Sequence, residues 1–166
     1  MRLKMLLTFI ICMMMFGCDS KMDAETKDVS KLKDDQAILE KLMALPKNPK
    51  IIKWEINEQL NRGDGMLIAL LKYSDEHYNY IVKNSPTMAV QHNVRMPVTF
   101  YKKWIPKLLR DSIKTNKTSK DNVYELIDIV SLQPDLFKNS AGLSPYIHGR
   151  ITPLGGGYVL TELNAM

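Results

Sequence analysis

The class of fold depends on residues 48–72, which read NPKIIKWEINEQLNRGDGMLIALLK. Asn48 can cap a helix, and Pro49 suits the first position of one. Apolar side chains then recur every fourth residue, at positions 52, 56 and 60, and Gly63 follows as a stop. After Asp64, a second possible cap, the apolar residues from 67 to 71 fit a short helical turn. This stretch therefore predicts helical structure on both sides of Gly63.

The neighbouring segments carry similar patterns. Apolar residues at helical spacing predict helices over 28–45, 74–84, 97–113 and 119–130. Pro106 has no N–H and must break the third of these, while Ser74 followed by two acidic residues is typical of a helix start. Residues 88–96 are weakly patterned and indicate a loop, and Pro134 begins one further turn through Phe137.

The C-terminal tail has a different character. Residues 146–152 and 158–163 are rich in β-branched and aromatic side chains, and Gly155 to Gly157 lie between them. Three glycines supply the positive φ that a reversal needs, so the tail predicts a β-hairpin with two edges free for strand addition. We therefore expect residues 28–166 to form a single, mostly helical domain. Its fold class is mainly α: a compact bundle or short helical-hairpin array of about five or six helices with a C-terminal β-hairpin.

The first twenty residues have the pattern of an export signal. Arg2 and Lys4 precede a nearly continuous apolar run from Met5 to Phe16. A run of this length fits a signal core and is shorter than the roughly 20 residues that span a bilayer. Its end, Met15-Phe16-Gly17-Cys18, resembles the lipobox of a bacterial lipoprotein signal peptide. The resemblance covers this segment alone and implies a signal peptide over 1–17 and acylation of Cys18, with palmitate as a typical chain.

The same resemblance implies a location. More than one acyl chain on Cys18 would anchor the protein durably to the cell envelope, facing the periplasm. Residues 18–27 then form the lipidated Cys and a polar tether. Asp19 resembles a retention signal that favours the inner over the outer membrane. Because Cys12 lies in the signal, the mature domain would keep no free thiol and would fold without disulfides.

The charge of the chain does not indicate a particular class of binding partner. The chain has 23 basic and 18 acidic residues, and without Arg2 and Lys4 the basic surplus falls to about three. There is no dense basic patch, and an export signal argues against a nucleic-acid partner. A mixed-charge, solvated surface is the simplest interpretation.

No motif predicts catalysis, a metal or a cofactor. His77, His92 and His148 lack the spacing of a metal site, and there is no G-x-S-x-G sequence. Pairs of carboxylates can cleave glycans, so Glu55 with Glu58, or Asp75 with Glu76, define an alternative: a cell-wall-active enzyme or glycan-binding module. Acidic residues at these spacings more often lie on a solvated helix face.

Aromatic residues beside charges suggest a protein interface. The candidates are Tyr73, Tyr78, Tyr80, Tyr101 and Trp104; packing in a small helical core is the simpler explanation for them. The leading hypothesis is a non-enzymatic, lipid-anchored interaction protein. Its partner would be another envelope protein or an incoming one, so the chain would act as an accessory subunit of an envelope assembly or as an immunity protein against an envelope-acting toxin.

Overall fold

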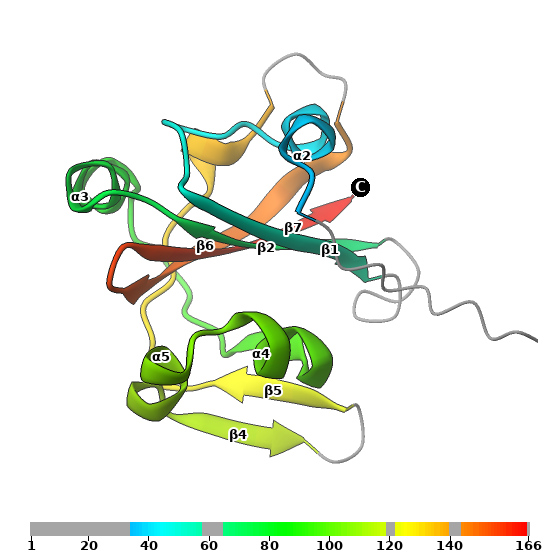
Figure 1. Cartoon of the computed structure of the whole chain (residues 1–166), viewed down its shortest axis with the longest axis vertical. Coiled ribbons are helices and arrows are strands. Elements are labelled where there is room, and N and C mark those ends of the chain that lie inside the picture. Colours follow the sequence, from blue (N-terminus) through cyan, green and yellow to red (C-terminus); the bar gives the residue numbers. More distant parts are fainter. Residues whose placement is uncertain (1–33, 58–64, 119–121, 140–143, 166) are drawn as a thin grey trace, which may run out of the picture.

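A computed structural model of the chain describes residues 34–57, 65–118, 122–139 and 144–165, and these form two antiparallel sheets with helices packed around them (Figure 1). The larger sheet contains, in spatial order, β1 (Ile51–Asn57), β2 (Met66–Lys72), β7 (Tyr158–Ala165) and β6 (Tyr146–Gly155). The smaller sheet contains β3 (Val94–Pro97), β5 (Val123–Leu126) and β4 (Thr115–Thr118). The helices are α2 (Gln36–Leu42), α3 (Asp75–Asn84), α4 (Val98–Trp104) and α5 (Lys107–Ser112), with a 3-10 turn, η1 (Asp135–Phe137).

The prediction of a mainly α fold is wrong, because β-strands dominate the described residues. The error begins at β1, where a helix was expected. Spacing by four satisfies a strand as well as a helix, and Ile52, Trp54 and Ile56 alternate with polar residues. Each residue of β1 has an antiparallel partner on β2, from Ile51 opposite Lys72 to Asn57 opposite Met66. The alternation of apolar and polar residues, which is typical of a strand, therefore matches the observed structure of β1.

Strand β2 lies inside the larger sheet, between β1 and β7. Its residues from Met66 to Leu71 are all buried. A strand that is covered on both faces has no polar face to reveal its period, so an unbroken apolar run of this length fits a strand or a buried helix equally well. The expected helical turn over 67–71 is therefore replaced by a central strand.

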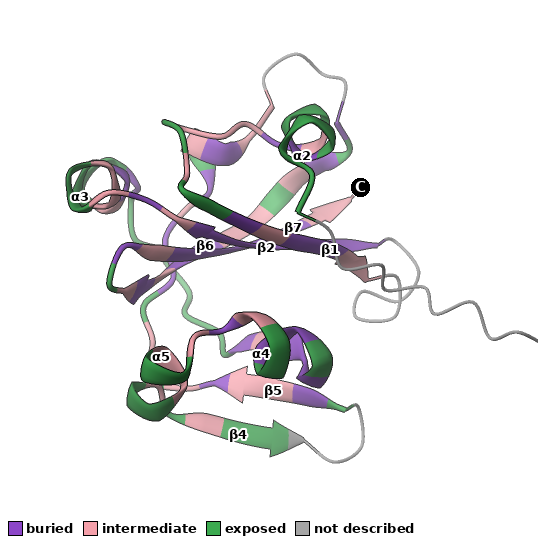
Figure 2. Ribbon diagram, viewed as in Figure 1, coloured by how far each residue is buried: buried purple, intermediate pink, exposed green. Residues whose placement is uncertain are grey.

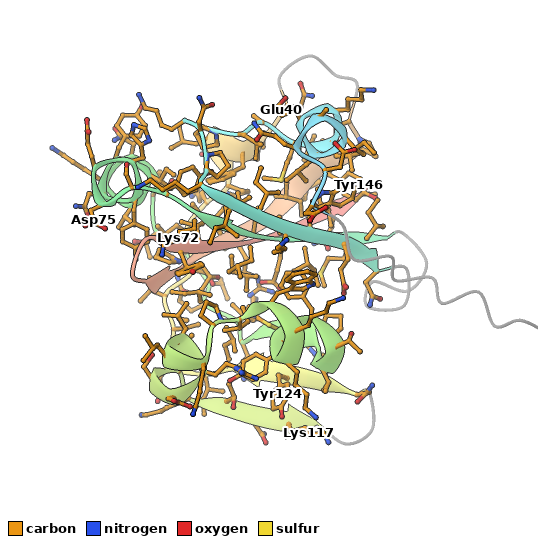
Figure 3. The ribbon with its side chains drawn as sticks, viewed as in Figure 1. Glu40, Lys72, Asp75, Lys117, Tyr124 and Tyr146 are labelled. Carbon is orange, nitrogen blue, oxygen red and sulfur yellow. The ribbon has the colours of Figure 1, made fainter. Side chains whose placement is uncertain are left out.

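Both faces of the larger sheet are covered. On the α2 side, Leu67 and Leu71 pack with residues of α2, α3 and η1, including Leu39, Ile81 and Phe137. Trp54, Tyr73 and Tyr146 belong to the same cluster, and Tyr146 is labelled close to α2 in Figure 3.

On the α4 side, Ile68 and Leu70 pack with residues of β3, α4 and β5, such as Met96, Phe100 and Leu126. Helix α4 lies between the larger sheet and strands β4 and β5, and α5 lies beside the ends of these two strands (Figure 1). The most deeply buried ribbon is that of the larger sheet (Figure 2).

Several helical predictions are confirmed. Helix α3 begins after Ser74, whose Oγ accepts a hydrogen bond from the N–H of His77 at 3.3 Å. The helix over 97–113 is broken at Pro106 into α4 and α5. In contrast, residues 123–126 form strand β5 and not a helix. Strand β3 (Val94–Pro97) takes the last three residues of the expected loop over 88–96 and the first residue of the helix expected over 97–113.

The C-terminal hairpin is present as β6 and β7, with Gly155 to Gly157 at positive φ in the turn. It does not pack as a separate unit on a helical bundle, because β7 also pairs along its length with β2. The prediction of two free edges is therefore wrong, and only the outer edge of β6 is left. No helix in the described part of the chain is long and apolar enough to cross a membrane.

Candidate binding cavity beside strand β6

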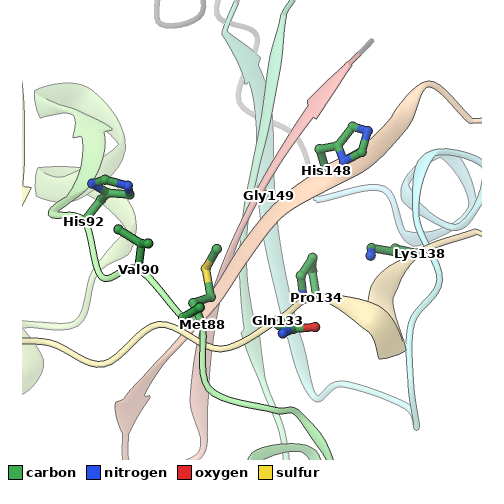
Figure 4. Close-up of a pocket in the computed structure, with 9 residues that line it drawn as sticks. Met88, Val90, His92, Gln133, Pro134, Lys138, His148 and Gly149 are labelled. Carbon is green, nitrogen blue, oxygen red and sulfur yellow. The ribbon is translucent and has the colours of Figure 1, made fainter.

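A surface cavity of about 390 Å³ lies beside the outer edge of β6. Three separate segments form it: residues 88–92, residues 133–138, and His148 with Gly149 on β6. In Figure 4, His92 lies at one end of the group and Lys138 at the other, with Met88, Gln133 and Gly149 between them. The lining combines apolar side chains, two imidazoles, an amide and an ammonium group, which is a composition suited to binding.

The wall formed by residues 88–92 is held in place by one side-chain amide. Gln91 Oε1 accepts from the N–H of Ser131 at 2.7 Å, and Gln91 Nε2 donates to the carbonyl of Ser131 at 3.0 Å. The same Nε2 donates to the carbonyl of Met88 at 2.9 Å, and the Met88 N–H donates to Ser131 O at 3.1 Å. The wall is therefore fixed by polar contacts, although Val90 on it is 59 % exposed. A preformed wall lowers the entropy lost on binding.

A second anchor ties this wall to the sheet interior. Arg150 of β6 donates from Nη1 to the carbonyl of His92 at 2.9 Å. Its Nε lies 3.0 Å from Glu162 Oε2 of β7, an ionic contact without the alignment of a hydrogen bond. The other oxygen, Glu162 Oε1, accepts from the backbone N–H of Arg95 at 3.3 Å. Glu162 is 3 % exposed, so the cavity wall is connected to a buried carboxylate.

Glu162 belongs to a row of residues that crosses the α4 side of the larger sheet. Glu55 of β1 is opposite Ile68, Ile68 is opposite Glu162, and Glu162 is opposite Arg150. Burial raises the pKa of Glu162 from 4.5 to about 7, and this effect exceeds the lowering by Arg150 and by the Arg95 N–H. Arg95 also lies 3.3 Å from Glu125 Oε1 of β5 through its Nε. Each ion pair therefore lies within one sheet, and the hydrogen bond from the Arg95 N–H to Glu162 joins the two sheets on this side.

The predicted aromatic residues do not form one surface. Tyr73 is buried among core residues of the α2 side, and burial raises the pKa of its hydroxyl well above the usual value. Tyr78 is half-buried, and its hydroxyl accepts from the N–H of Gly155 at 3.2 Å. Tyr80 is exposed and lies below Lys47, whose Nζ is 4.9 Å from the ring centre.

The other two aromatic candidates lie on the opposite side of the larger sheet. Tyr101 is buried and its ring centre lies 4.3 Å from that of Tyr124. Trp104 is half-buried and is flanked by the ammonium groups of Lys53 and Lys103, at 4.5 and 4.9 Å. The packing alternative therefore explains Tyr73 and Tyr101, and an aromatic interface stays a prediction for the remaining three.

The acidic candidates are also separated. Glu55 is completely buried, Asp75 and Glu76 are exposed in the first turn of α3, and Glu58 lies outside the described residues. Glu55 and Glu162 are both buried, so a glycan does not reach their carboxylates in this fold. Cys18 and Asp19 also lie outside the described residues. Among the described residues, no group of three or more His, Cys, Asp or Glu is placed to hold a metal ion.

The cavity itself was not predicted from the sequence. Its segments are distant along the chain, and the loop assigned over 88–96 gave no reason to join it to residues 133–138. One local signal was present: Gly149 inside a strand-like run, which typically marks a bulge or a close backbone approach. The structure has such an irregularity in β6 between Tyr146 and His148. Comparison with protein-family models, curated proteins and solved structures finds no match to this chain.

Proposed function

We propose that this chain is a lipid-anchored interaction protein of the bacterial envelope, facing the periplasm, and that a partner protein binds at the β6 cavity. The observation that carries the proposal is the preformed wall 88–92, where the Gln91 amide holds an exposed Val90 beside the cavity. Exposed apolar side chains on a fixed wall favour association because little order is lost on binding. The anchor rests on Met15-Phe16-Gly17-Cys18.

Two roles within this class differ in the identity of the partner. A toxin that acts in the envelope would make the chain an immunity protein, and a component of an envelope machine would make it an accessory subunit. Both roles need a specific protein contact and an anchor at the membrane surface. The alternative of a cell-wall enzyme or glycan-binding module loses its clearest carboxylate, since Glu55 is completely buried.

The test is a crosslinked pull-down of the tagged protein from detergent-solubilised envelopes, followed by mass spectrometry. The unaltered chain is compared with Val90→Asp, which places a charge on the cavity wall. The matched control is Leu108→Asp, since Leu108 is 84 % exposed on α5 and does not line the cavity. We expect one dominant protein with the unaltered chain and the control, and at least a tenfold loss with Val90→Asp.

Two results would contradict the proposal. Equal capture by Val90→Asp would place the contact away from the cavity. No protein enriched above an unrelated lipoprotein would end the interaction hypothesis, and assays of glycan cleavage and glycan binding would then follow.

A further inference from the structure

The corner formed by α4 and α5 carries a surplus of positive charge. Residues 99–112 contain a single acidic residue, Asp111, and four basic ones. Three of the basic side chains are exposed and the last is half-buried: Lys102, Lys103, Lys107 and Arg110. Among the described residues, none of these four cations forms an ion pair. Their charge is therefore available to an anionic partner.

The break at Pro106 brings these cations together. The chain turns there from α4 into α5, and Arg110 Nη1 donates to the carbonyl of Lys102, in the last turn of α4, at 3.2 Å. The corner lies on the α4 side of the larger sheet, whereas α2 and α3 lie on the opposite side (Figure 1). The fold thus gathers cations that are too widely spaced in the sequence to form a dense basic run.

Apolar side chains lie among the cations. Leu108, in the first turn of α5, is 84 % exposed, more than any other large hydrophobic side chain that the structure describes. Trp104, at the end of α4, is half-buried, and the ammonium groups of Lys53 and Lys103 lie 4.5 and 4.9 Å from its ring centre. Protein interfaces are usually depleted in lysine. Leucine and tryptophan among lysines are instead typical of side chains at a membrane surface.

The proposed membrane anchor joins the domain beside the same corner. The first residue that the structure describes is Asp34, whose Oδ2 lies 3.2 Å from Lys53 Nζ. This ammonium group is the one that lies 4.5 Å from the ring centre of Trp104. Residues 19–33 connect Cys18 to Asp34. The chain from an acylated Cys18 therefore enters the domain next to Trp104.

From these observations, and resting on the proposed lipid anchor, we infer that the α4–α5 corner binds an anionic phospholipid surface and so fixes the orientation of the domain on the membrane. The cations contact lipid phosphates, and Leu108 enters the boundary between headgroups and acyl chains. The long lysine side chains reach the phosphates while their apolar stems lie along the lipid. None of the residues of this corner lines the β6 cavity, which stays open to a protein partner.

Vesicles of two compositions separate this contact from the anchor. The acylated protein isolated from envelopes is reconstituted into vesicles of phosphatidylcholine alone, or with about 30 % phosphatidylglycerol, so that the anchor is the same in both. Hydrogen exchange with mass spectrometry follows the amides of residues 99–112. We expect exchange to be slower by about fivefold or more on the anionic vesicles. The difference should disappear in about 0.5 M sodium chloride, which reduces the Debye length to about 4 Å.

Variants then assign the contact to this corner. Lys103→Gln combined with Lys107→Gln should remove most of the difference between the two kinds of vesicle. Lys41→Gln combined with Lys83→Gln is the matched control, because it removes the same charge from exposed positions on α2 and α3, and it should keep the difference. Leu108→Asp should lose the protection on anionic vesicles. Its exchange in detergent should equal that of the unaltered chain, which shows that the variant is folded.

Three results would overturn the inference. The first is equal exchange of residues 99–112 on the two kinds of vesicle, and the second is a difference that persists when Lys103 and Lys107 are both replaced. The third is protection in whole envelopes but not on anionic vesicles, which would assign the corner to a protein partner.

These results are separable from a failure of the proposed function. In detergent, where no bilayer is present, Leu108→Asp should still capture the envelope partner. Val90→Asp should lose that partner and keep the protection on anionic vesicles. An intact mass without acyl groups would contradict the anchor and not the lipid contact, which the difference between the two kinds of vesicle measures.

Discussion

The two sides of the larger sheet are built differently. The α2 side is a continuous apolar cluster, with Trp54, Leu67 and Phe137 completely buried. The α4 side has an apolar cluster of its own, but the carboxylates of Glu55 and Glu162 are also buried on this side. Arg150 forms an ion pair with Glu162. One side is therefore held mainly by apolar packing, and the other by packing together with ionic contacts whose strength depends on pH.

This difference has a functional consequence. Arg150 contacts the buried Glu162 and also holds the His92 carbonyl at the end of the cavity wall. The cavity is thus coupled to the α4 side, whose charges can change, as well as to the α2 side, where Phe137 of η1 is packed. Stability measurements on the two sides should differ both in size and in pH dependence.

The largest loss of stability is expected from a substitution on the α2 side. Replacing Trp54 with Ala should lower the free energy of unfolding by about 3–5 kcal/mol, because it removes a completely buried indole and leaves a cavity. The indole N–H also donates to the carbonyl of Asp35 at 3.1 Å, next to α2. Urea denaturation at pH 5 and at pH 7 measures the loss.

The loss should be the same at both pH values, since packing of an indole involves no titration. The control is Leu108→Ala, which should change stability by no more than about 0.5 kcal/mol because Leu108 is 84 % exposed. A loss from Trp54→Ala that varies strongly with pH would show that the two sides are not independent.

The second-largest effect is the pH dependence of the free energy of unfolding that arises from Glu162 on the α4 side. The pKa of Glu162 is about 7 in the folded protein, above its ordinary 4.5, so the folded state binds this proton more tightly than the unfolded state. The corresponding stabilisation is fully present below pH 4.5 and is lost as the pH rises to 7. Its size is about 3 kcal/mol, at 1.36 kcal/mol for each pH unit.

Replacing Glu162 with Gln removes this titration. Between pH 4.5 and 7, the stability of the variant should therefore rise relative to that of the unaltered protein by about 3 kcal/mol. Glu40→Gln on the exposed face of α2 is the matched control, and its curve should run parallel to that of the unaltered protein. Parallel curves for Glu162→Gln would mean that folding does not raise the pKa of Glu162.

The same contrast explains what the sequence could predict. Features with a local chemical cause were found, namely the cap at Ser74, the break at Pro106 and the glycine turn before Tyr158. The strands of the larger sheet were missed where burial on both faces hides the alternation, as in Met66 to Leu71. In β5, Val123 and Leu126 are three apart, which fits a helix, and only pairing with β3 and β4 gives them a strand conformation.

The candidate site could not be predicted from local patterns in the sequence. Its wall depends on Gln91 meeting Ser131, forty positions later, and its edge depends on Leu132 pairing with Ile151. Such contacts arise from tertiary structure and leave no spacing to detect. The proline at 134 and the glycine at 149 were visible in the sequence, but only the tertiary structure brings them to one cavity.

The smallest effect concerns the cap of α3, which tests how much local signals contribute on the packed α2 side. Ser74→Ala should lower stability by about 1 kcal/mol, because the N–H of His77 loses its acceptor. Ser74→Asp should retain most of the stability, since a carboxylate also accepts this bond and favours the helix N-terminus. Hydrogen exchange of the α3 amides is the sensitive measurement, because Ile81 is the helix's one fully enclosed side chain and the helix can open without the sheet. If Ser74→Ala exchanges as slowly as the unaltered chain, contacts of Ile81 with the sheet hold the helix and the cap merely marks where it begins.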